Sequence, residues 1–240
     1  MIIAEAGINH NGDMGIARSL IDSAASAGAD AVKFQNYRAE LLAPPGQFRE
    51  LLKSCQLTQG NTELLAHYCK DRNITFLSTP FDKDSADLIE ALVPMFKIGS
   101  GQSNDLDFLR HVSRKRKPMI ISTGMSEFPD IRRALTVVDV PITLLHCVSL
   151  YPAPPEKADL GRMCRMMREF SFPVGYSDHT EGIEIALAAK ELGAVVLEKH
   201  ITLDKNMDGP DHKASITPEE LKALVLGIKK IEQSLFMEPT

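Results

Sequence analysis

Residues 174–200 read VGYSDHTEGIEIALAAKELGAVVLEKH, in which a short β-rich run, a helical pattern and a second β-rich run follow one another. The same order recurs from end to end of the chain. We predict eight strands, each followed by a segment that can form a helix: Met1–Glu5, Ala31–Gln35, Ile74–Ser78, Met95–Gly99, Pro118–Thr123, Ile142–Cys147, Val174–Ser177 and Ala194–Lys199. Strands that alternate with helical patterns indicate βαβ units and a parallel sheet.

Eight such units in 240 residues predict an α/β fold, a single-domain (β/α)8 TIM barrel over residues 1–240, because such barrels typically have about 250 residues. The alternative is a doubly wound open sheet. No GxGxxG motif follows the first strand, and polar residues gather at the strand ends along the whole chain. Only a barrel brings eight strand ends to one face, so we favour the barrel.

Two helices carry clear signals. The first has small apolar residues at helical spacing on one face, at Ala17, Leu20, Ile21, Ala24 and Gly28. The last begins with a capping box and an N1 proline at Thr217–Glu220, and its apolar face comprises Leu221, Leu224, Val225, Ile228, Ile231 and Leu235. Two connections, Asn36–Gly60 and Asp204–Ile216, are long, and long loops in a compact domain are usually functional.

The composition excludes several classes of protein. Hydrophobic residues make up 44% and charged residues 25% of the chain, as in ordinary globular proteins, and the net charge is −5. No basic run offers a phosphate-neutralising face, so we expect no nucleic-acid or anionic-membrane partner. No apolar stretch could span a membrane, and Met1–Ala6 lacks the basic start of a signal peptide. The cysteines, Cys55, Cys69, Cys147 and Cys164, lack CxxC spacing and predict reduced thiols. We therefore expect a cytoplasmic enzyme.

Charged residues interrupt strands that should be nearly continuous in Val, Ile and Leu. Lys33 lies in AVKFQ and Lys97 in MFKIG, while Glu5, Gln35 and the run 198–200 end strands one, two and eight. Burying an ammonium group without a partner costs several kcal/mol. Each lysine could pair with a glutamate in a structural network, or both could project into an anion site at the C-terminal mouth.

Small hydroxyl residues and glycines favour the anion site. They follow several strands, at Ser78-Thr79, Gly99–Gly101, Ser122–Gly124, Ser149 and Ser177. A single Ser-Gly pair is a common turn. The recurrence of hydroxyls and glycine amides at the same end of several strands, together with two ammonium groups, predicts a cradle for phosphate or carboxylate.

The histidines offer a metal site. His179 follows strand seven and His200 ends strand eight, and these strands are neighbours in a barrel. Two imidazoles with oxygen donors suit a divalent metal with open positions for substrate, although two unrelated strand-end histidines remain the alternative. We expect His10 to act in a loop near the mouth. His146 could belong to the core or to a pocket wall.

Two further histidines, His67 and His111, fall in predicted helices and are expected at the surface. The long loop after strand eight contains Asp211 and His212, and Gly209-Pro210 gives it a defined turn. This loop is either a solvated surface segment or a clamp over the mouth, in which Asp211 binds sugar hydroxyls.

Taken together, these strings resemble the sialic acid synthase family over essentially the whole chain. The motifs are AEAGINHNG (4–12), AVKFQ (31–35), FLSTPF (76–81), FKIGSG (96–101), ISTGM (121–125), LLHCVSLYPAP (144–154), GYSDHT (175–180), LEKH (197–200) and GPDHKAS (209–215). The resemblance implies a transferase that condenses phosphoenolpyruvate with an N-acetylated amino sugar such as N-acetylmannosamine. The product would be a nine-carbon nonulosonic 2-keto acid, with release of phosphate.

The resemblance also assigns roles by motif. It implies Mn²⁺ or Mg²⁺ held by His179 and His200, and catalytic roles for Glu5, Lys33, Lys97 and Gln102. Phosphoenolpyruvate would be bound by Lys33, Thr79, Lys97, Ser100, Ser122, Ser149 and Ser177. The sugar side would be lined by Glu5, Gln35, Tyr151 and Asp211.

Three departures from the family pattern affect these expectations. Members of the family usually continue into a small antifreeze-like domain that completes a neighbour's sugar site in a dimer, whereas this sequence ends at Thr240. We expect a homodimer, or a separate chain that supplies the missing domain. Gln102 stands where the family usually has a carboxylate that manages the attacking water, and an amide cannot accept that proton. Ser149 stands where some members carry Asn.

Three functions are therefore compared. The leading one is a metal-dependent synthase that joins phosphoenolpyruvate to an aldehyde sugar. The second is a metal-dependent aldolase or lyase that acts on another aldehyde at the same mouth. The third is a catalytically weak barrel that binds phosphoenolpyruvate or a sugar, for which Gln102 is the main support.

Overall fold

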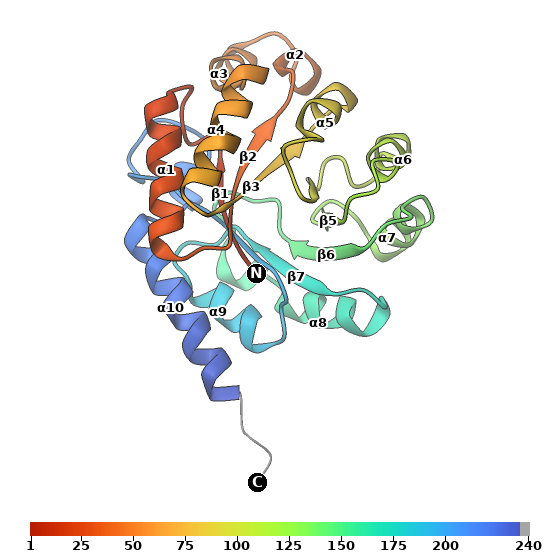
Figure 1. Ribbon diagram of the computed structural model, residues 1–240. Helices are drawn as coiled ribbons and strands as arrows, with labels where there is room; N and C mark the ends of the chain where they lie inside the picture. The colour runs from red at the N-terminus through yellow and green to blue at the C-terminus, as the bar shows by residue number, and fades with distance from the viewer. Residues whose placement is uncertain (236–240) are drawn as a thin grey trace.

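The computed structural model describes residues 1–235, and its centre is a ring of eight parallel strands surrounded by helices (Figure 1). The strands are β1 (Ile2–Gly7), β2 (Ala31–Asn36), β3 (Thr75–Pro80), β4 (Phe96–Ile98), β5 (Met119–Ser122), β6 (Ile142–Cys147), β7 (Val174–Asp178) and β8 (Leu197–His200). Their hydrogen-bonded order is β3-β2-β1-β8-β7-β6-β5-β4. β3 and β4 also lie side by side, but no hydrogen-bonded ladder joins them among residues 1–235, so the barrel is nearly closed.

Helices connect successive strands and cover the outside of the ring. They are α1 (Met14–Ala27), α2 (Ala39–Leu42), α3 (Gln47–Cys55), α4 (Gln59–Asp71), α5 (Lys83–Ile89), α6 (Leu106–Ser113), α7 (Phe128–Leu135), α8 (Leu160–Glu169), α9 (Glu184–Glu191) and α10 (Pro218–Leu235), with short 3-10 turns at Pro155–Lys157 and His212–Ala214. The fold is the predicted (β/α)8 barrel. Within the described chain, no helix is long and apolar enough to cross a membrane.

The inside of the barrel is built in layers, because alternate residues of a strand face the same side. An apolar layer consists of Ile3, Ala31, Leu77, Ile120, Leu145 and Val196. Two residues further along the same strands, the layer is Glu5, Lys33, Thr79, Ser122, Cys147 and Glu198. Apolar side chains therefore fill the inside of the barrel at the first layer. Polar side chains form the next layer, which lies nearer the C-terminal ends of the strands.

The predicted helix faces agree with the packing in most positions. Ala17, Leu20, Ile21 and Ala24 of α1 are fully buried. Gly28 was predicted on that face, but it follows the helix as its C-cap with φ of 84°, a conformation that glycine adopts without a Cβ clash.

Helix α10 begins with the predicted capping box. The Glu220 carboxylate accepts from the Thr217 amide at 2.7 Å, and Thr217 Oγ1 accepts from the Glu220 amide at 3.3 Å. The buried face of the helix comprises Leu221, Leu224, Val225 and Ile228, with Ile231 half-buried. The predicted position of the Leu235 side chain lies outside the described residues.

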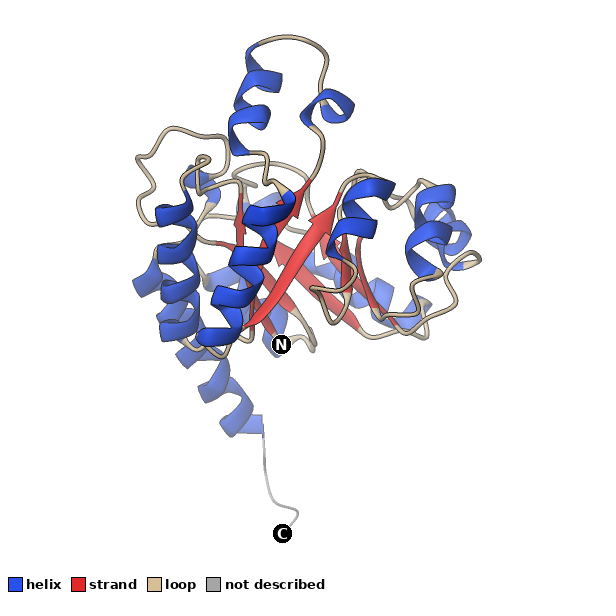
Figure 2. Cartoon of the chain, turned by 45° about the horizontal axis from the view of Figure 1, so that its top comes forward, coloured by secondary structure: helices blue, strands red, loops and turns tan. Residues whose placement is uncertain are grey.

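The connection after β2 differs from the loop predicted over Asn36–Gly60. It contains α2 and α3, which stand above the ring at the top of Figure 2. Their inner side packs on a small separate core formed by Ile8, Tyr37, Ala39, Ala43, Leu52 and Cys55. This cluster gives the connection an ordered structure beside the barrel mouth.

Candidate active site

A cavity of about 240 Å³ lies at the C-terminal mouth of the barrel. It is lined by Glu5, Lys33, Gln35, Phe81, Lys97, Ser100, Gly101, Ser122, Met125, Cys147, Ser149, Tyr151, Ser177, His179, Glu198 and His200. The strand ends thus bring together most of the residues that the sequence singled out. Thr79, Gln102 and Asp211 are not among the lining residues.

Lys33 is held from three sides beneath the mouth. Its ammonium nitrogen lies 2.8 Å from Glu5 Oε2 and 3.7 Å from Glu198 Oε2, and it donates to Thr79 Oγ1 at 2.8 Å. Glu5 is the register partner of Lys33 on the neighbouring strand, which explains their contact. Thr79 therefore does not line the cavity itself, but it holds Lys33, which does.

Lys97 reaches the same cavity from β4, which is separated from the strand of Lys33 by β3 alone. It donates to Ser122 Oγ at 2.7 Å and to the Ile98 carbonyl oxygen at 3.3 Å, and it lies 3.5 Å from Glu198 Oε1. The pairing of the lysines with glutamates is thus confirmed, and the anion site stays a prediction. Each lysine is paired with carboxylates, and each lines the mouth.

Glu198 connects the two lysines, and sequence reasoning did not assign it to the site. Its Oε1 accepts from Ser177 Oγ at 2.8 Å, and its buried Oε2 has no hydrogen-bond partner within the described chain. The signal was present in LEKH, because Glu198 and His200 are two residues apart and must face the same side of β8. Gly101, predicted as part of the cradle, lines the cavity, whereas Phe81, Met125 and Cys147 were missed, because apolar residues and a lone thiol carried no chemical signal.

Burial and pairing set the ionisation of this cluster. Burial raises the pKa of Glu5, against the opposing influence of Lys33. Burial alone would also raise the pKa of Glu198, but Lys33, Lys97 and the Ser177 hydrogen bond outweigh it and lower that pKa. Burial lowers the pKa of Lys97 although Glu198 opposes it, whereas Glu198 and Glu5 overcome burial and raise the pKa of Lys33. The floor of the mouth thus holds two lysine ammonium groups beside two carboxyl groups.

A group of hydroxyls lines the wall next to Lys97. Ser100 Oγ accepts from the Gly124 amide at 3.0 Å and lies 3.1 Å from Cys147 Sγ. A Cβ at Gly124 would lie 2.7 Å from that sulfur, 2.8 Å from Ser149 Oγ and 3.0 Å from Ser100 Oγ. The wall therefore closes tightly around a position that only glycine can occupy without displacing these groups.

His179 and His200 face one another with ring centroids 5.5 Å apart. His179 Nδ1 lies 2.6 Å from the Val148 carbonyl oxygen, which can only accept, so Nδ1 carries the proton and Nε2 carries the lone pair. His200 Nδ1 is buried and has no hydrogen-bond partner within residues 1–235. Burial lowers the pKa of both imidazoles. Two neutral imidazoles, one fixed by a carbonyl and one with a free nitrogen, fit the donor set of a divalent metal.

The rest of that donor set is not supplied by protein side chains. Among residues 1–235, no group of three or more His, Cys, Asp or Glu side chains is arranged to hold a metal ion. Asp211 comes nearest, with Oδ2 at 3.7 Å from His200 Nδ1, and burial raises the pKa of Asp211 to about 6. A metal on the two histidines would therefore keep positions for water or substrate oxygens.

The residues predicted for the sugar side lie around these histidines. Tyr151 stacks on His179 with ring centroids 4.1 Å apart and meets His200 edge-on at 5.6 Å. Gln35 donates to Glu5 Oε1 at 3.2 Å. Asp211 lies beside His200 but outside the cavity lining.

Gln102 departs from its predicted catalytic position. The backbone N–H of Gln102 donates to the Gly99 carbonyl oxygen at 3.1 Å in a turn. The buried side-chain oxygen of Gln102 has no hydrogen-bond partner in the described chain. That oxygen points toward Gly99, where an added Cβ would lie 3.1 Å away. The turn after β4 therefore directs this side chain beside the cavity rather than into its wall.

The other histidines do not join the mouth cavity. His10 is buried in the loop after β1 and accepts from the Gly12 amide at 3.1 Å. His146 is buried outside the ring, 2.8 Å from the Ala158 carbonyl oxygen, and lines a separate surface cavity near α8. His67 is exposed on α4, and His111 on α6 is half-buried against Asp87. Thr202 holds His212 within the long loop, with the hydroxyl 2.7 Å from Nδ1.

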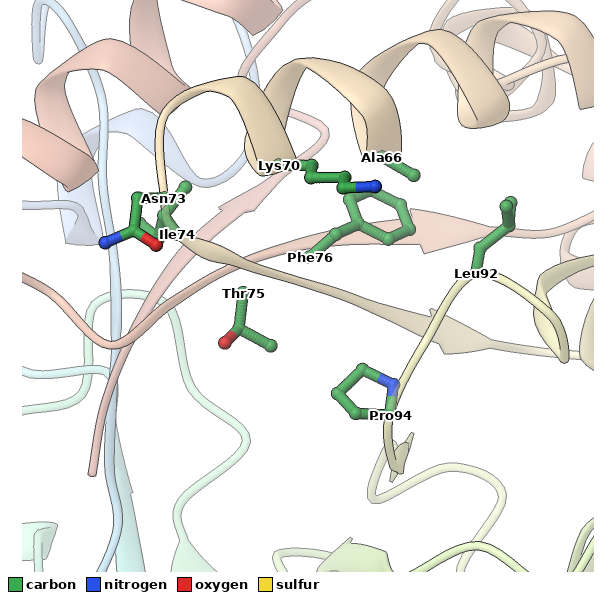
Figure 3. A pocket seen from close by; sticks show the side chains of 8 residues that line it. All are labelled: Ala66, Lys70, Asn73, Ile74, Thr75, Phe76, Leu92 and Pro94. Atoms are coloured by element: carbon green, nitrogen blue, oxygen red, sulfur yellow. The ribbon is translucent and has the colours of Figure 1, made fainter.

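Another cavity, of about 360 Å³, lies outside the barrel between α4 and β3 (Figure 3). It is lined by Ala66, Lys70, Asn73, Ile74, Thr75, Phe76, Leu92 and Pro94. Lys70 is its single ionisable lining residue, and the close-up shows its side chain extending from α4. This cavity lacks the convergent polar groups of the mouth, so the mouth is the better candidate for chemistry.

This chain is similar to known proteins over nearly its whole length. The sequence profile of the NeuB family matches residues 20–238. N,N'-diacetyllegionaminic acid synthases from Campylobacter jejuni and Legionella pneumophila are 44% and 41% identical to this chain; each match covers 98% of it and 77% and 72% of the relative. The crystal structure of N-acetylneuraminic acid (sialic acid) synthetase from Leptospira borgpetersenii, in complex with citrate, superposes with a TM-score of 0.96 at 35% identity, covering all of this chain and 87% of that one.

Proposed function

This chain belongs to the NeuB family, and we propose that it condenses phosphoenolpyruvate with an N-acetylated amino-sugar aldehyde similar to N-acetylmannosamine. The products are a nonulosonic, sialic-type 2-keto acid and inorganic phosphate. The relatives named above are synthases of N-acetylated sugar acids, which supports this class of acceptor.

The two buried lysines are the observation that carries the proposal. Lys33 on β2 and Lys97 on β4 reach one cavity on either side of β3, among hydroxyl groups of several strands. A small, highly charged anion such as phosphoenolpyruvate matches two ammonium groups and the nearby serine hydroxyls. We assign Ser100, Ser122, Ser149 and Ser177 to its phosphate and carboxylate groups.

The sugar occupies the other half of the mouth in this proposal. His179 and His200 would hold Mn²⁺ or Mg²⁺, which supplies Lewis-acid polarisation of an aldehyde oxygen. Gln35, Glu5 and Tyr151 lie on that side of the cavity and offer hydrogen bonds to sugar hydroxyls. Asp211, close to His200, is positioned by its loop to contact the outer part of the sugar.

The reaction then follows from holding two small substrates together. The C3 carbon of phosphoenolpyruvate attacks the aldehyde carbon, so a C–C bond forms and positive charge develops at C2. Water adds at C2, and the bond between C2 and the phosphate oxygen breaks to release phosphate. Lys33 and Lys97 stabilise the anionic groups throughout, and fixing both substrates at contact distance supplies much of the rate. Glu5, whose pKa is raised by burial, can hold a proton near the sugar oxygen.

A phosphate-release assay tests this function. Phosphate should appear from phosphoenolpyruvate only when Mn²⁺ and N-acetylmannosamine, or a related N-acetylated aldehyde sugar, are both present. Release that is independent of every sugar offered would contradict the condensation. His179→Ala and His200→Ala should each abolish metal-dependent turnover while the protein stays folded, and normal activity in either variant would contradict the metal assignment.

A second function is favoured by Gln102. No carboxylate stands at that position, and the side chain does not line the cavity, so a barrel that binds substrates without fast turnover is the competing candidate. Gln102→Glu separates the two. If the chain is catalytically weak, the substitution should raise turnover about tenfold or more, because a positioned general base supplies at least that much. If it is a competent synthase, turnover should change little.

A further inference from the structure

Strands β7 and β8 are joined by side-chain contacts on both faces of the sheet, immediately before the two histidines. Ser177 pairs with Glu198 in the strand register, and Asp178 pairs with Lys199. The first pair faces the mouth and is joined by the 2.8 Å hydrogen bond described above. The second pair faces the opposite side, toward the helices, because alternate residues of a strand point to opposite faces.

The Asp178–Lys199 pair is an ion pair in the protein interior. Lys199 Nζ lies 2.8 Å from Asp178 Oδ2, and both side chains are 0% exposed. Lys199 also donates to the Thr180 carbonyl oxygen. Asp178 Oδ1 accepts from the Thr180 amide at 2.9 Å and from its hydroxyl at 2.8 Å. These contacts fix the strand ends and the turn that carries His179.

Stability alone is a weak reason for such a pair. Replacing a buried ion pair by well-packed apolar side chains is often neutral or stabilising, whereas the best-attested use of buried charges is to specify register. Asp178 and Lys199 directly precede His179 and His200 in the sequence. A change in how β7 and β8 align would therefore move one imidazole relative to the other.

We propose that the Asp178–Lys199 ion pair is a positioning device that sets the relative placement of His179 and His200, so that one divalent cation can bind both rings. This inference rests on the proposed metal site. Neither residue of the pair lines the mouth cavity, and neither contacts substrate or metal in this arrangement. Their effect passes through the strand ends and the Thr180 turn.

The test is the double substitution Asp178→Asn/Lys199→Met. Asn keeps an oxygen for the two Thr180 bonds, and Met keeps most of the lysine stem, so both charges are removed and neither is left unpaired. We expect Mn²⁺ affinity of the metal-free protein, measured without substrates by the electron paramagnetic resonance of free Mn²⁺, to fall about tenfold or more, as for other groups that orient metal ligands. The visible absorption spectrum of bound Co²⁺ should also change.

Lys115→Met is the matched control. Lys115 follows α6 and forms ion pairs with Asp87 and Glu90, lying 2.6 Å from the Glu90 carboxylate, and it does not line the mouth. This variant should lose stability without a change in Mn²⁺ affinity or the Co²⁺ spectrum. Circular dichroism and thermal unfolding of each variant establish that the folded state is compared. If the double variant does not fold, Asp178→Asn alone, which keeps the Thr180 contacts, should show a smaller loss of affinity in the same direction.

The measurements distinguish a failure of the proposed metal site from a failure of the proposed positioning role. If wild-type protein binds Mn²⁺ no better than His179→Ala/His200→Ala, the metal site itself is wrong and the inference is overturned with it. If wild type binds Mn²⁺ through the histidines and the folded ion-pair variant binds it equally well with an unchanged Co²⁺ spectrum, the metal site stands and the positioning role is overturned.

Discussion

The wall of the mouth depends on the missing side chain of Gly124. Gly124→Ala would place a methyl group 2.7 Å from Cys147 Sγ and within 3.0 Å of the Ser149 and Ser100 hydroxyls. Such overpacking typically costs about 1–3 kcal/mol, and a loss of about 1.4 kcal/mol in binding is tenfold in affinity. We expect the dissociation constant for phosphoenolpyruvate, measured by calorimetry, to rise about tenfold or more.

Gly101→Ala provides the control for that substitution. Gly101 also lines the mouth, but an added Cβ there would meet no atom within 4 Å. The affinity of this variant should stay within about twofold of wild type, since open space accepts a methyl group without displacement. Equal effects of the two substitutions would show that the cradle does not lie at Gly124.

Lys33 has a structural and a binding role in this account. Lys33→Met would leave Glu5 and Glu198 together beneath the mouth with only Lys97 near Glu198. Breaking a buried ion pair costs about 3–5 kcal/mol, so the free energy of unfolding from urea titration should fall by about that amount. Phosphoenolpyruvate binding should be lost as well. Lys83→Met, on an exposed side chain, is the control, and a stable Lys33→Met protein with full binding would contradict both roles.

Single residues also show where sequence reasoning succeeded. A lysine in a strand that should be apolar is costly, so Lys33 and Lys97 could be recognised without a structure. Glu198 was missed because its charge was attributed to the end of a strand rather than to its inward-facing side. Gln102 could not be placed, because the direction of a side chain in a turn depends on local backbone geometry that spacing does not encode.

At the scale of elements, the last helix depends on its first turn. Thr217→Ala removes the hydroxyl that accepts from the Glu220 amide. Loss of an N-cap typically costs about 1 kcal/mol, so the urea midpoint should decrease while phosphoenolpyruvate binding is unchanged. Ser234→Ala, which removes an exposed hydroxyl that donates to the Ile231 carbonyl, should have a much smaller effect. Equal stability of Thr217→Ala and wild type would contradict the capping role.

The strands were easier to predict than the long connections. Parallel strands are apolar runs between helical segments, and most predicted bounds lie within one or two residues of the observed ones. The start of β8 was less clear, because the strand begins at Leu197 rather than at the predicted Ala194. The helices α2 and α3, of 4 and 9 residues, were not predicted, because the whole segment Asn36–Gly60 was interpreted as a long loop.

At the scale of the whole molecule, the barrel explains why distant residues form one site. The lining residues come from β1 to β8, from Glu5 to His200, and share a cavity because parallel strands end on one face. Sequence could predict this convergence once eight units had been counted. It could not predict that Glu5 and Glu198 pair with the two lysines, since that depends on which side chains approach one another across the ring.

The central claim is that phosphate leaves by cleavage of the bond between C2 and oxygen after carbon–carbon bond formation. The most direct measurement is the mass of the released phosphate when phosphoenolpyruvate, Mn²⁺ and N-acetylmannosamine react with the protein in ¹⁸O-water. Because water adds to C2, the account predicts sugar-dependent release of phosphate without ¹⁸O, in equal amount to a 2-keto acid product. Phosphate that carries ¹⁸O, or that is released without a new carbon–carbon bond, would contradict the account.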